Sequence, residues 1–409
     1  RSKFSVASNG VLYRTDKVGC IPDILDLWFS QRVEFKNKMK EYGKSGEKDK
    51  YEWYKKRQLV QKILLNSLYG VLGLPAFRFY DVDNATAVTT TGQTVIKSTA
   101  DMANIKYNKE LGTPDADSNI YIDTDSVFFS AAPLLDFRIP NWKDNDQNTI
   151  AGFVNNIAEE MQDYLNDFYD ILAQKVFNVD KDKHRFEIKK EYVSKSGIWI
   201  AKKRYAQWII SDNGVPVDKL DVKGLDVVRS SYPAAFRKFM SEILIEILRG
   251  DDEETITNRI DTFKKELPTM DVVNIAKAGA VKNLSKYMPK KRNQTAMFQF
   301  VSGTPAHVKA SIAYNQLLKH FKVENQFEPL KDGDKIKWVY LKQNPYGLDG
   351  VAMNGYNDPP QIMELINTYI NHDKIFEREL LKKLEDFYGA LDWGEVLSST
   401  KTAEKFFSF

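Results

Sequence analysis

The feature that most constrains the fold is a pair of helical segments separated by a short polar break. Residues 22–42 and 50–69 carry apolar side chains at helical spacing, and Pro22 stands in a first turn, where a helix accepts proline. The break, residues 43–49, is rich in lysine and contains glycine. Helices joined by so short a connection run antiparallel as neighbours. The sequence therefore predicts a helical hairpin over residues 22–69.

Segments typical of β-strands occur in several places. Apolar alternation around Asn9-Gly10 predicts a hairpin at the start of the chain, because this dipeptide accommodates positive φ in a tight turn. Residues 120–122 and 127–129 are rich in β-branched and aromatic side chains and flank a polar turn, which predicts a second hairpin. Residues 186–210 are also strand-rich.

Helical patterns occupy much of the remaining chain. Residues 84–111 form one predicted helix, with Asn84 as its N-cap and Gly112 as its terminator. Further helices are predicted over residues 159–177, 233–249 and 254–265. A strand-rich region gives way to helices near Gly224, which is the strongest candidate for a domain boundary. We expect two to three domains of mixed α and β structure.

Composition and charge exclude several classes of protein. The chain has 409 residues, 43% of them hydrophobic, so it can bury a large core. Its one cysteine, Cys20, can form no internal disulfide, which is typical of a reducing compartment. The longest apolar runs fall well short of the ~18 residues of a membrane span. We expect a cytoplasmic protein with no membrane association, and a net charge of +3 means that any nucleic-acid surface must be local.

Two carboxylates lie in the polar turn between residues 120–122 and 127–129. Asp123 and Asp125 are two positions apart, so both side chains could reach one hard, oxygen-preferring cation such as magnesium. Asp and Ser also favour turns for purely structural reasons, and the residues alone leave this alternative open.

One face of the second predicted helix combines a cation with polar groups. The segment KILLNSLYG places Lys62, Asn66 and Tyr69 at positions i, i+4 and i+7. The cation can meet a phosphate, while the amide and phenol meet a sugar or a base. Arg32 and Lys36 repeat the i, i+4 spacing on the first helix, so the hairpin could present three positive charges to one polyphosphate. A solvated helix face is the alternative.

Two basic runs are candidates for contact with nucleic acid. Lys202, Lys203 and Arg204 precede Tyr205 directly after an apolar, strand-like segment. Such a run could follow a phosphate backbone, or it could only protect the strand from aggregation. Residues 282–292 carry a second run, which is also typical of a solvated loop.

Two other kinds of site find no support. His184 and His307 have no Cys or His at ligand spacing, so we interpret them as structural or surface residues. The chain also contains no G-x-x-x-x-G-K-[ST] segment, which argues against a phosphate-binding loop of the P-loop type.

Taken in order, these segments resemble the family B DNA polymerases, most closely the replicative polymerases of T-even-like tailed phages. Residues 62–70 match the family's K-x-x-x-N-S-x-Y-G motif of the fingers, and residues 121–126 match its Y-G-D-T-D-S motif of the palm. The similarity continues through residues 84–87 and 202–206, the junction of Lys223 and Gly224, and the segment 305–307. It therefore spans nearly the whole chain.

The resemblance implies a right-hand polymerase fold of the α+β class, with an antiparallel palm sheet, helical-hairpin fingers and a mainly helical thumb. Residues 1–21 would be an edge hairpin of the palm, 22–73 the fingers, 74–225 the palm, 226–400 the thumb and 401–409 a clamp-binding tail. Phe406, Phe407 and Phe409 are similar to the aromatic peptide that docks on the sliding clamp in the phage polymerases. The alternative for this tail is packing on its own thumb.

The resemblance also implies an activity and its residues. The function would be DNA-directed DNA synthesis, in which deoxynucleotides are transferred to a primer 3′ end with two Mg²⁺ ions. The catalytic residues would be Asp123, Asp125 and Lys62, and the metal ligands Asp125 and Asp123 with Glu191 as a supporting carboxylate. The dNTP would be bound by Arg32, Lys36, Lys62, Asn66 and Tyr69. Primer–template DNA would be bound by Lys202, Lys203, Arg204, Tyr205, Lys290, Lys291 and Arg292.

The chain departs from the family pattern in three ways. Ile122 replaces the glycine of the palm motif. This replacement affects what can be expected of the local backbone, but both carboxylates of the motif are present. The tip of the fingers, residues 40–50, is shorter than in the T-even relatives. The family's other palm aspartate, in a D-x-x-S-L-Y-P-S segment, and its exonuclease with a D-x-E motif would precede residue 1.

The third departure leads to an expectation about partners. One pair of carboxylates on a turn cannot bracket two dications and leave room for substrate, so we expect the chain alone to be inactive. An amino-terminal polymerase chain or segment would supply the other aspartate and the exonuclease, whether the enzyme is naturally split or this is a fragment. The alternative is a non-catalytic DNA-binding subunit of a replication complex, which the presence of Asp125, Lys62 and Tyr69 disfavours. A phage-encoded enzyme would act in the host cytoplasm.

Overall fold

The computed structural model describes residues 3–288, 298–394 and 396. The chain divides into two compact units, Arg1–Glu191 and Tyr192–Phe409. The division falls before a strand at Tyr192 and not near Gly224, because the strands that follow pair with one another and pack on helices of the second unit. Long helices and small antiparallel sheets confirm the α+β class. Within the described ranges, no helix is long and apolar enough to cross a membrane.

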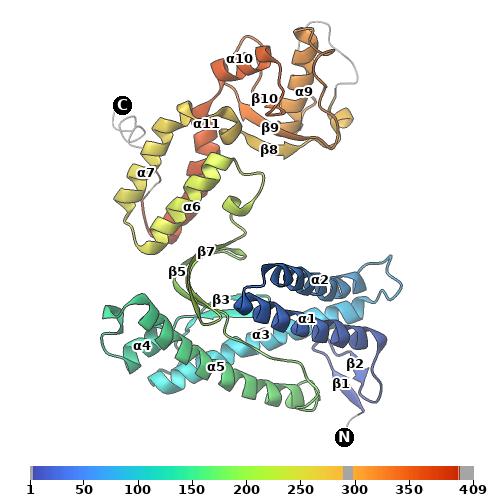
Figure 1. The fold of residues 1–409 in the computed structure, drawn as a ribbon, viewed down its shortest axis with the longest axis vertical. Helices are drawn as coiled ribbons and strands as arrows, with labels where there is room; N and C mark the ends of the chain where they lie inside the picture. The colour runs from blue at the N-terminus through green and yellow to red at the C-terminus, as the bar shows by residue number, and fades with distance from the viewer. Residues whose placement is uncertain (1–2, 289–297, 395, 397–409) are drawn as a thin grey trace. The chain divides into compact units, whose positions relative to one another are not determined.

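Helices α1 (Cys20–Ser45) and α2 (Lys48–Leu72) form the predicted antiparallel hairpin (Figure 1), and each is slightly longer than its sequence pattern indicated. Gly46 permits the tight connection, because it adopts the left-handed conformation at φ 77° and its amide donates to the carbonyl of Tyr42. α1 buries no side chain and α2 buries a single one near its end. The two helices therefore pack mainly against each other, for example where Tyr42 stacks on Tyr54 with ring centroids 5.5 Å apart.

Strands β1 (Phe4–Val6) and β2 (Leu12–Arg14) form the predicted opening hairpin. Gly10 lies in its turn at φ 86°, as the Asn-Gly signal indicated. The amide of Val6 donates to the carbonyl of Phe177 at 2.9 Å, so β1 is bonded beyond its own hairpin.

Helix α3 (Val82–Leu111) begins before Asn84, so the prediction of Asn84 as its cap is wrong. The N-cap is Asp81, whose carboxylate accepts a hydrogen bond from the amide of Asn84 at 2.9 Å. The side chain of Asn84 instead accepts from the phenol of Tyr13 at 2.7 Å, which fixes the opening hairpin to this helix. Gly112 ends α3 as predicted, in the left-handed conformation at φ 68°.

The core of the first unit lies between α3, the short helix α4 (Ala132–Arg138) and α5 (Gln147–Lys175). α5 begins well before residue 159, because the carboxylate of Asp146 caps it and accepts from the amide of Asn148 at 2.9 Å. The buried side chains are Ala103, Tyr107, Leu134, Leu135, Ile157, Met161 and Leu165. The hairpin of β3 (Asn119–Asp123) and β4 (Ser126–Phe129) packs on this core through Phe129.

The described residues of the second unit form two three-stranded antiparallel sheets. One has the order β5-β6-β7 and comprises β5 (Tyr192–Ala201), β6 (Arg204–Asp212) and β7 (Val215–Lys223). The other has the order β10-β9-β8 and comprises β8 (Lys277–Ala280), β9 (Lys335–Tyr340) and β10 (Gly350–Met353). The mainly helical region predicted after residue 226 therefore also contains a sheet.

Helices cover these sheets and share one continuous hydrophobic core. The longer helices are α6 (Ala234–Arg249), α7 (Glu253–Glu266), α9 (Ala306–His320) and α10 (Pro360–Tyr369). Shorter ones are α8 (Val272–Ile275), α11 (His372–Phe376), a π-helical turn (Glu377–Leu381) and α12 (Lys382–Ala390). α6 and α12 pack on β5, and α9 packs on β9 and β10.

Candidate functional site

The two aspartates lie at the tip of the β3–β4 hairpin. Asp123 pairs in register with Ser126, so Thr124 and Asp125 form a two-residue turn. Thr124 is left-handed at φ 54°, and its hydroxyl donates to the Asp123 carboxylate at 3.1 Å. The Asp125 amide and the Ser126 hydroxyl donate to the main-chain carbonyl of Asp123, at 2.6 and 3.0 Å. Local hydrogen bonds therefore hold both carboxylates at one tight turn.

The donors at this tip fit a hard divalent cation. Asp125 is exposed and Asp123 half-buried, and carboxylate oxygens are ligands that magnesium prefers. In the part of the chain that the structure describes, no three His, Cys, Asp or Glu side chains are grouped so that they could hold one ion. Glu191 is therefore not brought together with the two aspartates. Ile122, where the palm motif has glycine, is 37% exposed and pairs with Val127, so its side chain displaces no core residue.

The three predicted phosphate-binding cations lie on the helical hairpin, Arg32 and Lys36 on α1 and Lys62 on α2. None of them forms a salt bridge with a residue that the structure describes, and the buried Nε of Arg32 has no hydrogen-bond partner there. Lys38, Lys50 and Lys55 of the hairpin are each paired with a glutamate within one turn, whereas Lys40, Lys44, Lys48 and Lys56 have no such pair among the described residues. The charges of the three predicted cations are available to an anion, but other lysines of the hairpin share this property.

Lys36 lies in a cationic environment. Partial burial lowers its pKa below the ordinary lysine value, and the charges of Arg32, Lys40 and Lys189 lower the pKa further. Glu191 acts in the opposite direction and raises the pKa. Glu191 thus acts on Lys36, and a bound anion would relieve the repulsion between Lys36 and the neighbouring cations.

Lys62, Asn66 and Tyr69 are all exposed on α2 at the spacing of one helical face, and Tyr69 is 41% exposed. The helical conformation of α2 places these three side chains on one face, as the sequence predicted. Contact with a sugar or a base stays a prediction.

The first basic run lies at the turn between β5 and β6. Lys202 and Lys203 connect the strands, and Lys203 is left-handed at φ 61°. Arg204 begins β6, and its Nη2 donates to the carboxylate of Asp386 on α12 at 2.9 Å. The charge of Arg204 is therefore shared with a carboxylate before any DNA is bound.

Two residues support this turn from inside. Tyr205 is only 4% exposed, and its ring stacks on Trp199 with ring centroids 6.1 Å apart. Gly224, which follows β7, has φ 67°, and a Cβ atom there would lie 1.9 Å from the main-chain oxygen of Lys203. Only glycine allows so close a backbone approach. Gly224 and Tyr205 therefore set the position of the basic turn.

Sequence reasoning missed Asp386 and the structural role of Gly224. Asp386 is separated from Arg204 by 182 positions, so no local pattern signals their contact. Gly224 did carry a signal, because a glycine directly after a strand often marks positive φ or a close backbone approach. The predicted DNA-binding residues Lys290, Lys291 and Arg292 and the predicted clamp-binding residues Phe406, Phe407 and Phe409 lie outside the described residues.

The two histidines singled out from the sequence have structural surroundings. The Nε2 of His184 is 2.9 Å from a carboxylate oxygen of Asp170, and its side chain is 9% exposed. Burial lowers the pKa of His307, and the charge of Lys277 adds to this effect.

Comparison with known proteins adds a family to this geometry. The chain matches the sequence profile of DNA polymerase family B over residues 2–137 and 152–389. The DNA-directed DNA polymerase of Enterobacteria phage T4 is 29% identical over 340 residues, which cover 80% of this chain and 36% of the phage protein. That of Escherichia phage RB69 is 25% identical over 453 residues, covering 95% of this chain and 48% of the relative. A DNA polymerase of Thermococcus gorgonarius is 28% identical over 242 residues, 59% of this chain and 26% of that protein. The chain thus spans less than half the length of these relatives.

Proposed function

The chain belongs to DNA polymerase family B, and we propose that it carries the fingers, palm and thumb of a DNA-directed DNA polymerase. The observation that carries the proposal is the β3–β4 tip, where Asp123 and Asp125 share one turn. In this proposal residues 1–21 form an edge hairpin of the palm, 22–73 the fingers, 74–225 the palm, 226–400 the thumb and 401–409 a clamp-binding tail. The reaction is in-line attack of a primer 3′ oxygen on the α-phosphate of a dNTP, with pyrophosphate leaving.

Asp125 and Asp123 are the proposed ligands of Mg²⁺. Asp125 is the more exposed of the two, and Asp123 is oriented by the hydroxyl of Thr124. When bound, two Mg²⁺ ions would stabilise the negative charge on both the attacking and the leaving oxygen. Glu191 is the proposed supporting carboxylate of the palm, and its charge also raises the pKa of Lys36.

The helical hairpin is the proposed dNTP site. Arg32, Lys36 and Lys62 bind the triphosphate, since none of them is neutralised by a described carboxylate at salt-bridge distance. Lys62 also offsets charge on the leaving pyrophosphate. Asn66 and Tyr69, on the same face of α2, contact the nascent base pair and the sugar.

The β5–β6 turn is the proposed contact with the primer strand. Lys202, Lys203 and Arg204 neutralise phosphates near the primer 3′ end. Tyr205 is buried, so we assign to it the positioning of the turn.

Two further partners belong to the proposal. An amino-terminal polymerase segment or chain is the proposed source of the other palm aspartate, since two metal ions need carboxylates beyond one pair on a turn, and of the exonuclease. The aromatic residues Phe406, Phe407 and Phe409 would dock on a sliding clamp. An enzyme of this kind encoded by a phage acts in the host cytoplasm.

Primer extension tests the proposal. The chain is combined with the amino-terminal polypeptide, primer–template DNA, dNTPs and Mg²⁺, and Asp125→Asn is expected to abolish extension while DNA affinity, measured by fluorescence anisotropy, is unchanged. Asp115→Asn, at an exposed turn before β3, is the matched control and should extend normally. Full extension by Asp125→Asn would contradict the catalytic assignment. DNA binding without extension in every combination would favour a non-catalytic DNA-binding subunit.

A further inference from the structure

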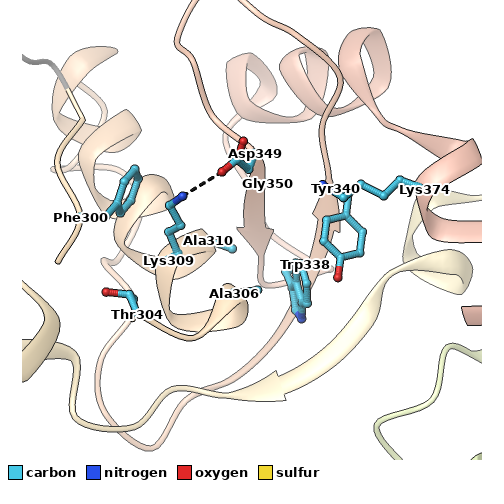
Figure 2. Close-up of a pocket in the computed structure, with 10 residues that line it drawn as sticks. All are labelled: Phe300, Thr304, Ala306, Lys309, Ala310, Trp338, Tyr340, Asp349, Gly350 and Lys374. Carbon is cyan, nitrogen blue, oxygen red and sulfur yellow. Dashed lines mark hydrogen bonds and ion pairs between the residues drawn. The ribbon is translucent and has the colours of Figure 1, made fainter. Parts of the chain in front are cut away.

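The second unit contains a pocket of about 260 Å³ between helix α9 and strands β9 and β10 (Figure 2). Aromatic rings and charged groups line it together, namely Phe300, Trp338, Tyr340, Lys309, Asp349 and Lys374. None of these residues belongs to the proposed polymerase site. The pocket therefore needs a separate explanation.

Rings lie on both sides of the pocket. Trp338 and Tyr340 project from β9 and meet edge to face, with ring centroids 4.8 Å apart. Phe300 lies on the opposite side, next to α9 (Figure 2). Ala306 and Ala310 on α9 also line the pocket, and their small side chains leave space between the rings. Trp338 is only 6% exposed, so the half-buried rings of Phe300 and Tyr340 are the ones that a flat, aromatic ligand could contact.

Positive charge accompanies the rings. The Nζ of Lys374 lies 4.8 Å from the ring centroid of Tyr340, and that of Lys309 lies 4.9 Å from the ring centroid of Phe300. Lys309 pairs with Asp349 at 2.8 Å, whereas Lys374 has no salt bridge to any described residue. Lys374 is thus not held in a salt bridge. The hydrogen bond from Lys309 lowers the pKa of the Asp349 carboxyl, and the charge of Lys374, acting at a distance, adds to this effect.

The N-terminus of α9 adds to this charge. The helix begins at Ala306, which lines the pocket, and no described side chain caps its first turn. Free amide groups and the helix dipole favour a phosphate at such a position.

We propose that this pocket binds a single nucleotide, with its base among the aromatic rings and its phosphate near Lys374 and the first turn of α9. The volume admits one nucleotide and excludes a duplex. The nucleotide is either a free mononucleotide or one unit of single-stranded DNA, since both present a flat base and a phosphate.

Calorimetric titration of the full chain tests the proposal. Thymidine monophosphate and a short oligothymidylate are titrated separately, with EDTA and without primer–template. Ala306→Leu fills the pocket at an exposed position, and Lys374→Gln removes the unpaired charge; each is expected to weaken binding about tenfold or more. Lys238→Gln on α6, whose side chain is 83% exposed, is the matched control and should bind normally.

A third variant separates binding from a structural effect. Asp349→Asn removes the carboxylate that occupies Lys309, so anion binding should become tighter, whereas general damage to the pocket would weaken it. Circular dichroism and thermal unfolding verify that each variant is folded.

The outcomes are distinct. Binding of the mononucleotide alone supports the pocket and identifies free nucleotide as the ligand, and binding of the oligonucleotide alone identifies a single strand. Absence of saturable binding by either probe overturns the proposal. Binding that ignores Ala306→Leu and Lys374→Gln but is lost in Lys62→Ala also overturns it, because the ligand would then occupy the dNTP site. Primer extension plays no part in this measurement, so the pocket and the proposed polymerase activity can fail independently.

Discussion

The backbone of Gly224 approaches the carbonyl oxygen of Lys203 so closely that a Cβ atom at Gly224 would lie 1.9 Å from it. The contact joins the end of β7 to the turn that carries Lys202 and Arg204. The position of these cations therefore depends on a residue that has no side chain.

Gly224→Ala should destabilise the second unit and weaken primer–template binding. Left-handed backbone costs a non-glycine residue about 1–2 kcal/mol, and here displacement of the Lys203 carbonyl adds to that cost. Gly214→Ala is the control, because Gly214 is also left-handed, at φ 82°, but has no atom within 4 Å of the added Cβ. Urea denaturation should show a clearly larger loss for Gly224→Ala. An equal decrease in the free energy of unfolding for both variants would mean that the close approach of Gly224 to Lys203 does not contribute to stability.

The pair of Arg204 and Asp386 predicts opposite effects of two substitutions. Arg204→Ala should weaken primer–template binding and reduce the slope of log affinity against log salt by about 1, because one phosphate contact is lost. Asp386→Asn should strengthen binding, since it releases the guanidinium from a carboxylate 2.9 Å away. Asp218→Asn breaks a comparable contact with Arg249, 3.1 Å long, and serves as the control. Anisotropy at several salt concentrations measures all three, and weaker binding by Asp386→Asn would contradict the role of Arg204.

Lys62→Ala should mainly impair the use of dNTP. Loss of one charge-assisted phosphate contact is worth roughly 1.5–3 kcal/mol, which corresponds to an increase in KM of about 10- to 150-fold. Steady-state primer extension with varied dNTP gives this value. Lys55→Ala is the control, because Lys55 is paired with Glu52 at 2.8 Å. A change confined to DNA affinity would place Lys62 elsewhere in the reaction.

The lowered pKa of Lys36 predicts a pH dependence of dNTP binding. A lysine with a lowered pKa loses its charge at a lower pH than an ordinary lysine, so affinity for the triphosphate should fall early on the alkaline side. Lys36→Arg should flatten this fall, because arginine stays charged. Glu191→Gln removes the contribution that raises the pKa, so the fall should move to still lower pH. Nucleotide titrations across the alkaline range measure the curves, and identical curves for the three proteins would exclude Lys36 from the site.

Deletion of residues 406–409 should separate catalysis from processivity. If their phenylalanines bind a sliding clamp, extension of short primers is retained while stimulation by the clamp on long templates is lost. A conservative control is Lys405→Ala, which keeps the aromatic residues. Unchanged stimulation after the deletion would favour packing of the tail on its own thumb.

Local signals explain which parts of the fold were predictable from sequence. The helical hairpin and the two β-hairpins depend on polar breaks and on glycine-containing or polar turns, which are visible within a few residues. The sequence did not show that Asp81 and not Asn84 caps α3. The side chain of Asn84 accepts a hydrogen bond from Tyr13, which lies 71 positions away, so no local pattern records this contact. The sheet of β8, β9 and β10 was missed although β9 and β10 are joined by the short connection 341–349; β8 pairs with β9 only across residues 281–334, so its place in a sheet has no local signal.

In the candidate site, too, some features have a local sequence signal and others depend on residues far apart in the chain. Asp123, Asp125 and the face of Lys62 follow from turn and helix geometry over a few residues. Arg32 and Lys40 lie one helical turn from Lys36, but the effects of Lys189 and Glu191 on Lys36 and the contact of Arg204 with Asp386 join residues far apart in sequence, which no local pattern records.

The sparse burial of α1 and α2 has a consequence for how such a chain can vary. Apart from Leu72 at the end of α2, neither helix contributes a buried side chain. Whole helical turns can therefore be inserted or removed next to Gly46 without repacking the interior. Lys62 and Tyr69 lie toward the opposite end of α2, so the reach of the hairpin is free to evolve while the chemistry at its base is retained.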